Sequence, residues 1–273
     1  MKYNIRCGDI MVKKRILIAI SILSISLSVG LCVYPTVSNE YIESNIQEDI
    51  TEFDTKVEKV EEGSFEEAVE EGKVDEQSYP INEQGERVSD VPIYFEVDLD
   101  RLYKDSVEYN ESIKENQYSL LVNESSYVYP ALDLTQYGIY DGIYGYVSAP
   151  SVDMQIPIYL GANDTTMHYG AGHMTYTSLP IGGESTNTVL TAHTGYIGRT
   201  FFDNIGNLEI GDEVYLTNYW GTLSYKVIDK EVHAPNDSQG VFIEEGKDLL
   251  TMITCVSDGY GGFNRYYVIC ERC

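Results

Sequence analysis

The sequence predicts a mostly β protein: a closed or nearly closed antiparallel barrel with short helices, preceded by a membrane-spanning helix and an acidic spacer. Three observations support this prediction. After Pro130, glycine, tyrosine and β-branched residues form short runs divided by turn residues at intervals of about 8–12 residues, as in sandwiches and barrels. Residues 35–117 are strongly acidic, and an uncharged apolar run lies near the N-terminus.

Length and composition limit the possible functions. The 273 residues leave room for one substantial domain with extensions. The 44 acidic residues outnumber the 18 basic ones, for a formal net charge of −26, which excludes a nucleic-acid partner because phosphates require a basic surface. The five cysteines are too scattered for a disulfide framework. Cys270 and Cys273 have C-x-x-C spacing but no second pair to complete a zinc site, so no metal or cofactor is expected.

The N-terminal segment predicts a membrane anchor. Residues 1–15 carry five basic residues and one acid, and residues 16–33 carry no charge. Such a run is long enough to span a bilayer, and Tyr34 suits the interface. The positive-inside rule places the tail in the cytoplasm, so residues 16–34 are expected to be an uncleaved signal-anchor with the rest of the chain outside. A cleaved signal peptide is the alternative, although Val33-Tyr34-Pro35 lacks the small residues of a cleavage site.

Residues 35–117 form the expected spacer. Acids are densest from Glu58 to Glu76, where apolar residues are few and no strand alternation persists. Like charges repel, so the first half of the spacer is expected to be extended, solvated and partly disordered. Apolar residues between Asp98 and Tyr118 have helix-like spacing, which predicts a helix along the surface of the domain.

Residues 118–273 are expected to form the folded domain. A short helix or turn is predicted at Thr200–Leu208. Seven stretches rich in β-branched and aromatic residues are predicted strands: Tyr144–Ala149, Ile156–Tyr159, Thr188–Ala192, Glu213–Thr217, Thr222–His233, Leu249–Thr254 and Arg265–Cys270.

Cys255 ends one predicted strand and Arg265 begins the next, with a turn-rich segment at residues 257–262 between them. A hairpin there would hold a thiol against a guanidinium. A fixed positive charge favours the thiolate form of a neighbouring thiol and can stabilise an oxyanion, which a cysteine nucleophile needs. Taken alone, the pair is more typical of a buried apolar cysteine and a surface arginine.

A third stretch changes this interpretation. The β-branched run from Asn187 ends at His193, which supplies the imidazole that a catalytic thiol requires. The T-L-T-A-H-like and T-x-I-T-C-like strand ends followed by arginine resemble the sortases, cysteine transpeptidases of Gram-positive cell surfaces. Four further stretches resemble class C, the pilin-polymerising sortases, in the same order: residues 145–159, 170–173, 177–183 and 211–215. The resemblance covers about Tyr144 to Arg272 and implies a closed eight-stranded barrel.

The resemblance implies roles for individual residues. Cys255 would be the nucleophile, His193 the general acid and base, and Arg265 the group that stabilises the oxyanion or holds the substrate. The loop before the catalytic strand would bind the apolar residues of a peptide sorting signal. The candidate substrate-binding residues are Thr254, His173, Val241, Phe242 and Ile243, with a structural role for His173 as the alternative.

Other polar residues are expected to have no catalytic role. His168 and His233 have no neighbouring motif. Asp237, Glu244 and Glu245 are candidates for the calcium site of some sortases, although acidic clusters are more often solvated. Pilin sortases carry an Asp-Pro-aromatic lid motif, which Ser125–Asp141 lacks; Tyr127 or Tyr129 is a candidate substitute. A second membrane helix, common at the C-terminus of that class, is not expected because the chain ends at Cys273.

The expected partners follow from the resemblance. They are secreted surface proteins or pilins with a C-terminal sorting signal, an amine acceptor, and membrane lipid around residues 16–34. The acceptor is expected to be a pilin lysine, with a peptidoglycan-precursor amine as the alternative. A barrel that only binds surface ligands is the alternative from another class, and the intact set of Cys255, His193 and Arg265 argues against it.

Overall fold

The computed structural model describes residues 7–58, 65–89, 97–121, 128–198, 201–235, 237 and 239–273. Eight strands form the folded body: β1 Ile143–Ala149, β2 Met154–Leu160, β3 Ala171–His173, β4 Thr186–Thr191, β5 Glu213–Asn218, β6 Gly221–His233, β7 Asp248–Ser257 and β8 Phe263–Arg272. The α-helices are α1 Cys7–Glu58, α2 Phe65–Glu70, α3 Leu99–Lys114, α4 Gln117–Leu120 and α5 Thr166–Tyr169. Short 3₁₀ helices are η2 Leu134–Tyr137, η3 Pro150–Val152, η4 Ile205–Asn207 and η5 Gln239–Val241.

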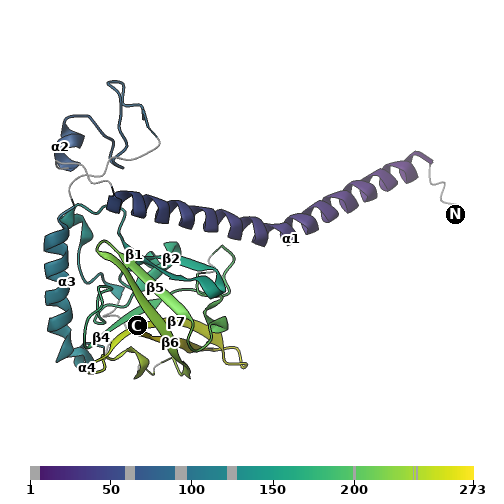
Figure 1. Ribbon diagram of the computed structural model, residues 1–273. Coiled ribbons are helices and arrows are strands. Elements are labelled where there is room, and N and C mark those ends of the chain that lie inside the picture. The colour runs from purple at the N-terminus through teal and green to yellow at the C-terminus, as the bar shows by residue number, and fades with distance from the viewer. Residues whose placement is uncertain are drawn as a thin grey trace.

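The strands close into a barrel in the order β1-β2-β3-β4-β7-β8-β6-β5, as Figure 1 shows beneath the long helix. The expected closed eight-stranded barrel is confirmed, but the expectation of a wholly antiparallel sheet is wrong. The β2–β3 pair and the β4–β7 pair are parallel. Parallel neighbours need a crossover between them, and the segments between β2 and β3 and between β4 and β7 supply it.

The seven predicted strands are present, several with longer bounds. β7 and β8 pair from Leu249–Glu271 to Ser257–Phe263, so both extend beyond Cys255 and Arg265 toward the hairpin turn. The missing eighth strand is β3, whose short segment pairs with β2 and β4. A three-residue strand that contains glycine has too little alternation to be found from the sequence. The predicted helix or turn after His193 corresponds to η4 and the turn before it.

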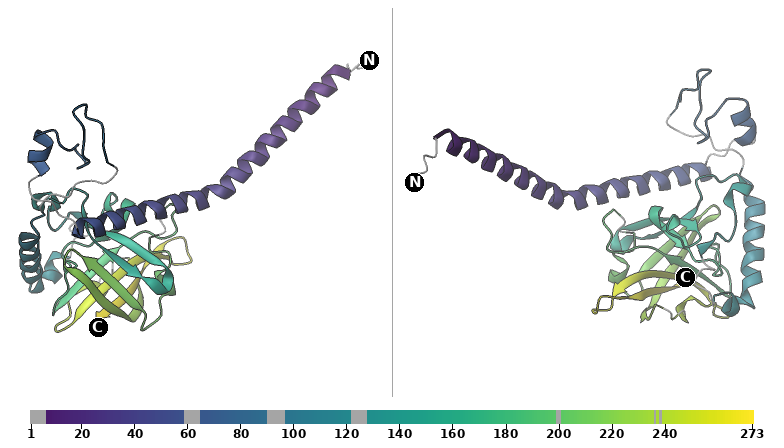
Figure 2. Two further views of the ribbon diagram at one scale, coloured as in Figure 1. Left: turned by 45° about the horizontal axis from the view of Figure 1, so that its top comes forward. Right: turned by 180° about the vertical axis from the view of Figure 1, so that it is seen from behind.

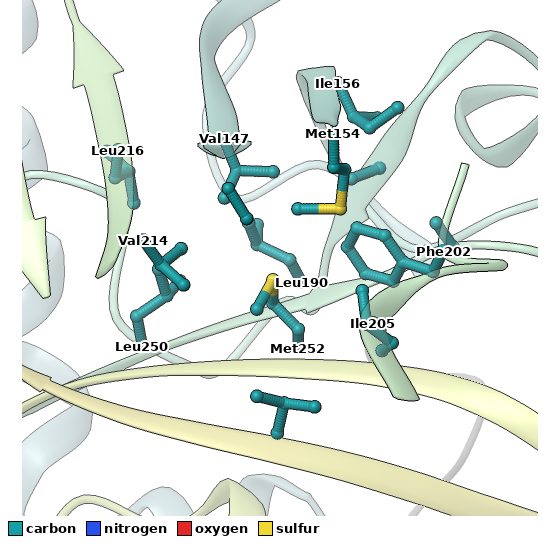
Figure 3. Close-up of a cluster of buried hydrophobic side chains, with 14 of the residues drawn as sticks. Val147, Met154, Ile156, Leu190, Phe202, Ile205, Val214, Leu216, Leu250 and Met252 are labelled. Atoms are coloured by element: carbon teal, nitrogen blue, oxygen red, sulfur yellow. The ribbon is translucent and has the colours of Figure 1, made fainter. Parts of the chain in front are cut away.

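A large apolar cluster fills the barrel, and Figure 3 shows part of it. Inward-facing residues from facing strands meet there, as the period-2 alternation of a strand requires. Its labelled members are Val147, Met154, Ile156, Leu190, Phe202, Ile205, Val214, Leu216, Leu250 and Met252. Cys270 is also buried in this cluster, and burial raises the pKa of its thiol to about 12, so it stays a neutral, inert thiol.

Helix α1 is one continuous element of 52 residues with Pro35 inside it. A proline removes one helical hydrogen bond and favours a kink, and the helix bends near its middle in Figure 1. The first half projects away from the barrel, while the second half runs across it (Figures 1 and 2). The exposed apolar first half is long and apolar enough to cross a membrane.

The second half of α1 corrects the predicted solvated spacer. Ile46, Ile50 and Phe53 are buried, and Phe53 packs its ring 5.9 Å from Tyr146 of β1. Their spacing of three or four residues gives the helix an apolar stripe, which the barrel covers. Four acidic residues of this half are exposed, so the high charge that predicted an extended chain is compatible with a docked helix: Glu40, Glu43, Glu48 and Asp54.

The next long helix of the N-terminal region flanks the barrel. α3 stands along its side in Figure 1, as predicted for residues 98–118. Asp98 caps this helix by accepting a hydrogen bond from the backbone N–H of Arg101. Leu102, Ser106, Asn110 and Ile113 form its buried stripe. Part of the densest acidic run, residues 59–64, lies outside the described residues.

Candidate functional site

The β7–β8 hairpin places the candidate nucleophile beside a cation. Cys255 and Arg265 are directly opposite each other in an antiparallel ladder, where side chains on one face are neighbours. The guanidinium Nη1 of Arg265 donates a hydrogen bond to the Cys255 Sγ over 2.9 Å. Both side chains are half-buried, so they are accessible from one side. A thiol with this partner is a stronger candidate nucleophile than a thiol in an apolar site.

The β4–β7 pair brings His193 to the same end of the barrel. The two strands are parallel, with Thr191 paired to Ile253, so their carboxyl ends lie at one edge of the sheet. His193 and Cys255 each follow two residues after this last pair. The Thr254 hydroxyl donates a hydrogen bond to the Ala192 carbonyl over 2.9 Å, which ties the two strand ends together.

A cavity of about 680 Å³ opens at this end of the barrel. Its volume lies in the range of small-molecule and peptide side-chain pockets. Apolar side chains predominate in its wall, and the three candidate catalytic residues line it together. The other lining residues are Tyr118, Leu121, Ala162, Met167, Met174, Thr191, Ala192, Pro235, Asp237, Val241, Phe242, Ile253, Thr254 and Tyr267.

Part of the cavity wall comes from Tyr118 and Leu121, which were not among the predicted substrate-binding residues. Gln117, at the start of α4, is buried and donates to the carbonyls of Tyr176 and Val241. Its side-chain oxygen accepts from the Ile243 backbone N–H over 2.8 Å. These bonds fix α4 against the loop before β7. Tyr118 then stacks on Phe242 with ring centroids 5.5 Å apart, and no local motif near residue 117 signals this contact.

The predicted substrate-binding residues divide into two groups. Thr254, Val241 and Phe242 line the cavity, as expected for residues that contact a substrate. Ile243 does not line it, and its backbone N–H instead anchors Gln117.

His173 is a correction to the predicted set. It is fully buried on β3, away from the cavity wall, and its Nε2 bonds the Ser178 carbonyl over 3.0 Å. Burial lowers the pKa of His173 to about 4, so the imidazole is neutral. The structure therefore favours the structural alternative for this histidine.

The other histidines and the calcium candidates are not predicted catalytic residues, although Asp237 lines the cavity and His233 lies opposite Arg265 in the β6–β8 ladder. His168 is exposed on α5, with its ring 4.9 Å from that of Tyr169. His233 bonds Glu231 and Asp237, and the Glu231 carboxylate raises the pKa of His233. Glu244 pairs with Lys247, while Glu245 is exposed. Within the described residues, no three His, Cys, Asp or Glu side chains gather in a group that could hold a metal ion.

The candidate lid residues do not line the cavity in the described part of the chain. Tyr129 has an exposed side chain and is absent from the cavity wall, while its carbonyl accepts from the Thr175 hydroxyl. Residues 122–127, which include Tyr127, lie outside the described residues.

Comparisons with known proteins find similarity to the sortases. Residues 147–273 match the family model of the sortase domain. Sortase A of Streptococcus agalactiae is 27% identical over 116 residues, which is 41% of this chain and 47% of that protein. Sortase D of Bacillus subtilis is 25% identical over 126 residues, 46% of this chain and 61% of that protein. The chain thus matches about half to three-fifths of these relatives.

Solved structures give the wider match. Sortase C1 of Streptococcus agalactiae aligns with a TM-score of 0.58 and 29% identity over 64% of this chain and 90% of that one. A protein described as a pilus-related sortase C of group B Streptococcus aligns with a TM-score of 0.56 and 29% identity over 64% and 89%.

Proposed function

We propose, on the premise that residues 147–273 belong to the sortase family, that the chain is a membrane-anchored cysteine transpeptidase. It would cleave a sorting signal in a secreted surface protein and transfer the acyl fragment to an amine. The observation that carries the proposal is the 2.9 Å hydrogen bond from Arg265 to the Cys255 thiol in a cavity that His193 also lines. A surface-binding domain without activity would have no need of this arrangement.

The first half of the reaction cleaves the peptide bond. The Cys255 thiolate attacks the scissile carbonyl carbon, and the carbonyl oxygen becomes an oxyanion that Arg265 can stabilise by hydrogen bonding and charge. The C–N bond then breaks, and the leaving amine takes a proton from His193. The product is a thioester between Cys255 and the amino-terminal fragment of the substrate.

The second half transfers the acyl group. An incoming amine attacks the thioester carbon, and His193 accepts the proton that the new amide must lose. The C–S bond breaks, which restores the thiolate, and the guanidinium of Arg265 is placed to stabilise it. The net result is one amide bond broken and another formed, with no oxidant or cofactor consumed.

A pilin lysine is the proposed acceptor. Support comes from the similarity to sortase C structures, one of them described as pilus-related, at 29% identity. A peptidoglycan-precursor amine is the second candidate, favoured by the sequence similarity to a sortase A. Incubation of the thioester form with a lysine-bearing pilin peptide and, separately, with a peptidoglycan-precursor amine would distinguish them by the mass of the product.

The proposed location is the outer face of the cell membrane. Its support is the exposed apolar half of α1, with a basic segment before it and the cavity-bearing barrel after it. The protein should sediment with membranes and resist alkaline extraction, while protease added to protoplasts should digest the barrel. Release of the full-length chain into the medium would contradict anchoring.

The decisive experiment for the activity is detection of the acyl-enzyme. Full-length protein incubated with a sorting-signal peptide should gain the mass of the acyl fragment at Cys255, and Cys255→Ala should show no adduct. Cys273→Ala is the matched control, because that thiol is exposed at the far end of β8 and lies outside the cavity. An adduct that persists in Cys255→Ala, with the fold intact by circular dichroism, would overturn the assignment.

A further inference from the structure

We infer that Asn39 of the anchor helix α1 is a positioning residue for the loop that carries His193. The inference rests on the proposed function, since it concerns the histidine of that reaction. It adds a feature outside the sortase domain: the segment that follows the membrane span would hold part of the catalytic site. Asn39 touches no reacting atom and would act through the loop alone.

The contact itself is a hydrogen bond across 159 sequence positions. The backbone N–H of Gly198 donates to the Asn39 Oδ1 over 2.6 Å. Gly198 has a φ of +73°, in the left-handed region that favours glycine. A side chain at this position would also collide with α1, because a Cβ would lie 2.7 Å from the Ser38 Oγ. The loop therefore approaches the helix closely, and glycine permits both the approach and the turn.

Two further bonds close the loop on the barrel side. The Phe202 N–H donates to the His193 carbonyl over 3.1 Å, and the Gly195 N–H donates to the Asp203 Oδ1 over 2.7 Å. Both join positions that are near each other in sequence. The hydrogen bond between Asn39 and Gly198 joins the loop to a separate element, at the part of the loop farthest from these two bonds.

Helix α1 packs against the barrel near Asn39. Pro35, Ser38, Asn39 and Ile42 are half-buried, and the stripe continues through Ile46 to the end of the docked half. Ile42 packs against the barrel cluster that contains Ala192 and Phe202, the residues on either side of the loop. The same packing therefore fixes both the helix and the two ends of the loop.

The orientation of His193 depends on this loop. The Tyr196 ring lies 5.0 Å from the His193 ring, at an angle of 47°. Tyr196 and Ile197 are both exposed, so the tip of the loop has little cover from the barrel. A proton-transferring histidine must stay within hydrogen-bond reach of the reacting nitrogen, and small displacements reduce its efficiency. Loss of the Asn39 tie would leave the histidine present and less well held.

The test uses the full chain in lipid nanodiscs. Asn39→Ala removes the acceptor, and Asn39→Asp keeps an oxygen at the same place and should restore it. Glu40→Ala, on the exposed side of the same turn, is the matched control. Hydrogen exchange is measured for the peptide from His193 to Phe202, and kcat, KM and the pH profile of kcat/KM are measured with a sorting-signal peptide.

The expected result is specific to the loop. In Asn39→Ala, exchange at the Gly198 amide should accelerate and kcat should fall about two- to tenfold, the effect of one lost hydrogen bond. KM should stay unchanged because Asn39 is outside the cavity wall, and the pH limb that reports His193 should shift. Gly198→Ala should have the same effects, since alanine is strained at a φ of +73° and its Cβ would lie 2.7 Å from the Ser38 Oγ.

Two outcomes would overturn the inference. One is exchange in Asn39→Ala equal to that in the wild type and in Glu40→Ala. The other is faster exchange with unchanged kcat and pH profile, which would make the contact merely structural. Failure of the proposed function would be seen separately, as the absence of an acyl-enzyme in the wild type. The exchange measurement would still test the Asn39–Gly198 hydrogen bond in that case.

Discussion

The β7–β8 hairpin and the His193 loop position the two halves of the same site by different means. In the hairpin, Cys255 and Arg265 are opposite residues of a ladder that is continuous from Leu249 to Ser257. The loop after β4 lies outside the eight strands, and its described residues form hydrogen bonds to Asn39 and Asp203 and within their own backbone. The thiol and its cation are therefore fixed by local pairing, while the histidine depends on contacts between distant segments.

This difference predicts which parts of the site should keep their position when a side chain is substituted. Strand pairing is supported by several neighbouring bonds, so loss of one side chain leaves the backbone in place. A loop held by a few contacts loses a large fraction of its support with each one. We therefore expect chemical substitutions in the hairpin to act on the reaction, and remote substitutions to act through the position of the loops.

The largest effect in this comparison is expected from Arg265→Lys. Lysine keeps the charge but loses the planar fork that can hold a thiolate or oxyanion with directed donors. Turnover should fall by roughly 10²–10³, the size of one lost oxyanion donor, with little change in KM.

Steady-state kinetics with a fluorogenic sorting-signal peptide measures this effect. Lys226→Ala serves as a control, because it is an exposed cation on β6 outside the cavity. Near-normal turnover in Arg265→Lys would show that the guanidinium geometry is not used, and that charge alone suffices in the hairpin.

A smaller effect is expected from Gln117→Ala, which breaks a remote support of the cavity wall. The change leaves the buried Val241 carbonyl without this partner, at about 1–3 kcal/mol, and removes two part-buried bonds, to the Tyr176 carbonyl and from the Ile243 N–H. The Tyr118–Phe242 stack should loosen, so KM should rise about tenfold while kcat changes little.

Ser119→Ala, on the exposed side of the same helix, is the matched control. Both variants are assayed well below their unfolding midpoints, so that lower stability does not reduce the active fraction. A KM equal to that of the control would mean that the α4 wall does not contact the substrate.

The smallest effect concerns the docking of α1 and its pH dependence. Burial against the barrel, followed by the charges of Glu52 and Glu48, raises the pKa of Asp49 from 3.8 to about 6. Tyr159 of β2 also interacts with this carboxylate. Because the folded pKa is raised, the associated stability is complete below pH 3.8 and is lost as the pH rises through about 6.

Asp49→Asn mimics the protonated side chain at every pH, so it isolates the pH-dependent stability that comes from the raised pKa of Asp49. Its thermal midpoint should exceed that of the wild type above pH 6 and approach it below pH 3.8. Glu48→Gln, at an exposed neighbouring position, should show a smaller change. A difference in thermal midpoint between Asp49→Asn and the wild type that stays constant across this pH range would show that docking of α1 does not bury Asp49.

Most of the barrel could be predicted because strands have local signatures. β-branched runs bounded by turn residues marked seven of the eight strands, and a thiol and an arginine flanking one hairpin indicated their pairing. β3 was missed because three residues are too few to show alternation. The parallel β4–β7 pairing was also missed, since no local pattern states which distant strands become neighbours.

The acidic segment was predicted less well than the barrel. Its charge predicted a solvated chain, yet residues from Ile46 to Phe53 place an apolar stripe on β1 and β2. The stripe is present in the sequence at helical spacing, but net charge dominated the interpretation. His173 was misplaced for a related reason, because a shared motif does not say whether a side chain faces a cavity or the interior.

Seven of the eight barrel strands, the apolar run in the first half of α1, and the pairing of Cys255 with Arg265 could be predicted from the sequence. These features depend on alternation, composition and a single hairpin, which act between residues close in the chain. Three contacts could be found only in the folded molecule: α1 docks on the barrel, Gln117 bonds the Ile243 N–H across 126 positions, and Asn39 meets Gly198 across 159. Such contacts form between segments whose approach is set by burial of the whole core, and that burial is a property of the complete fold.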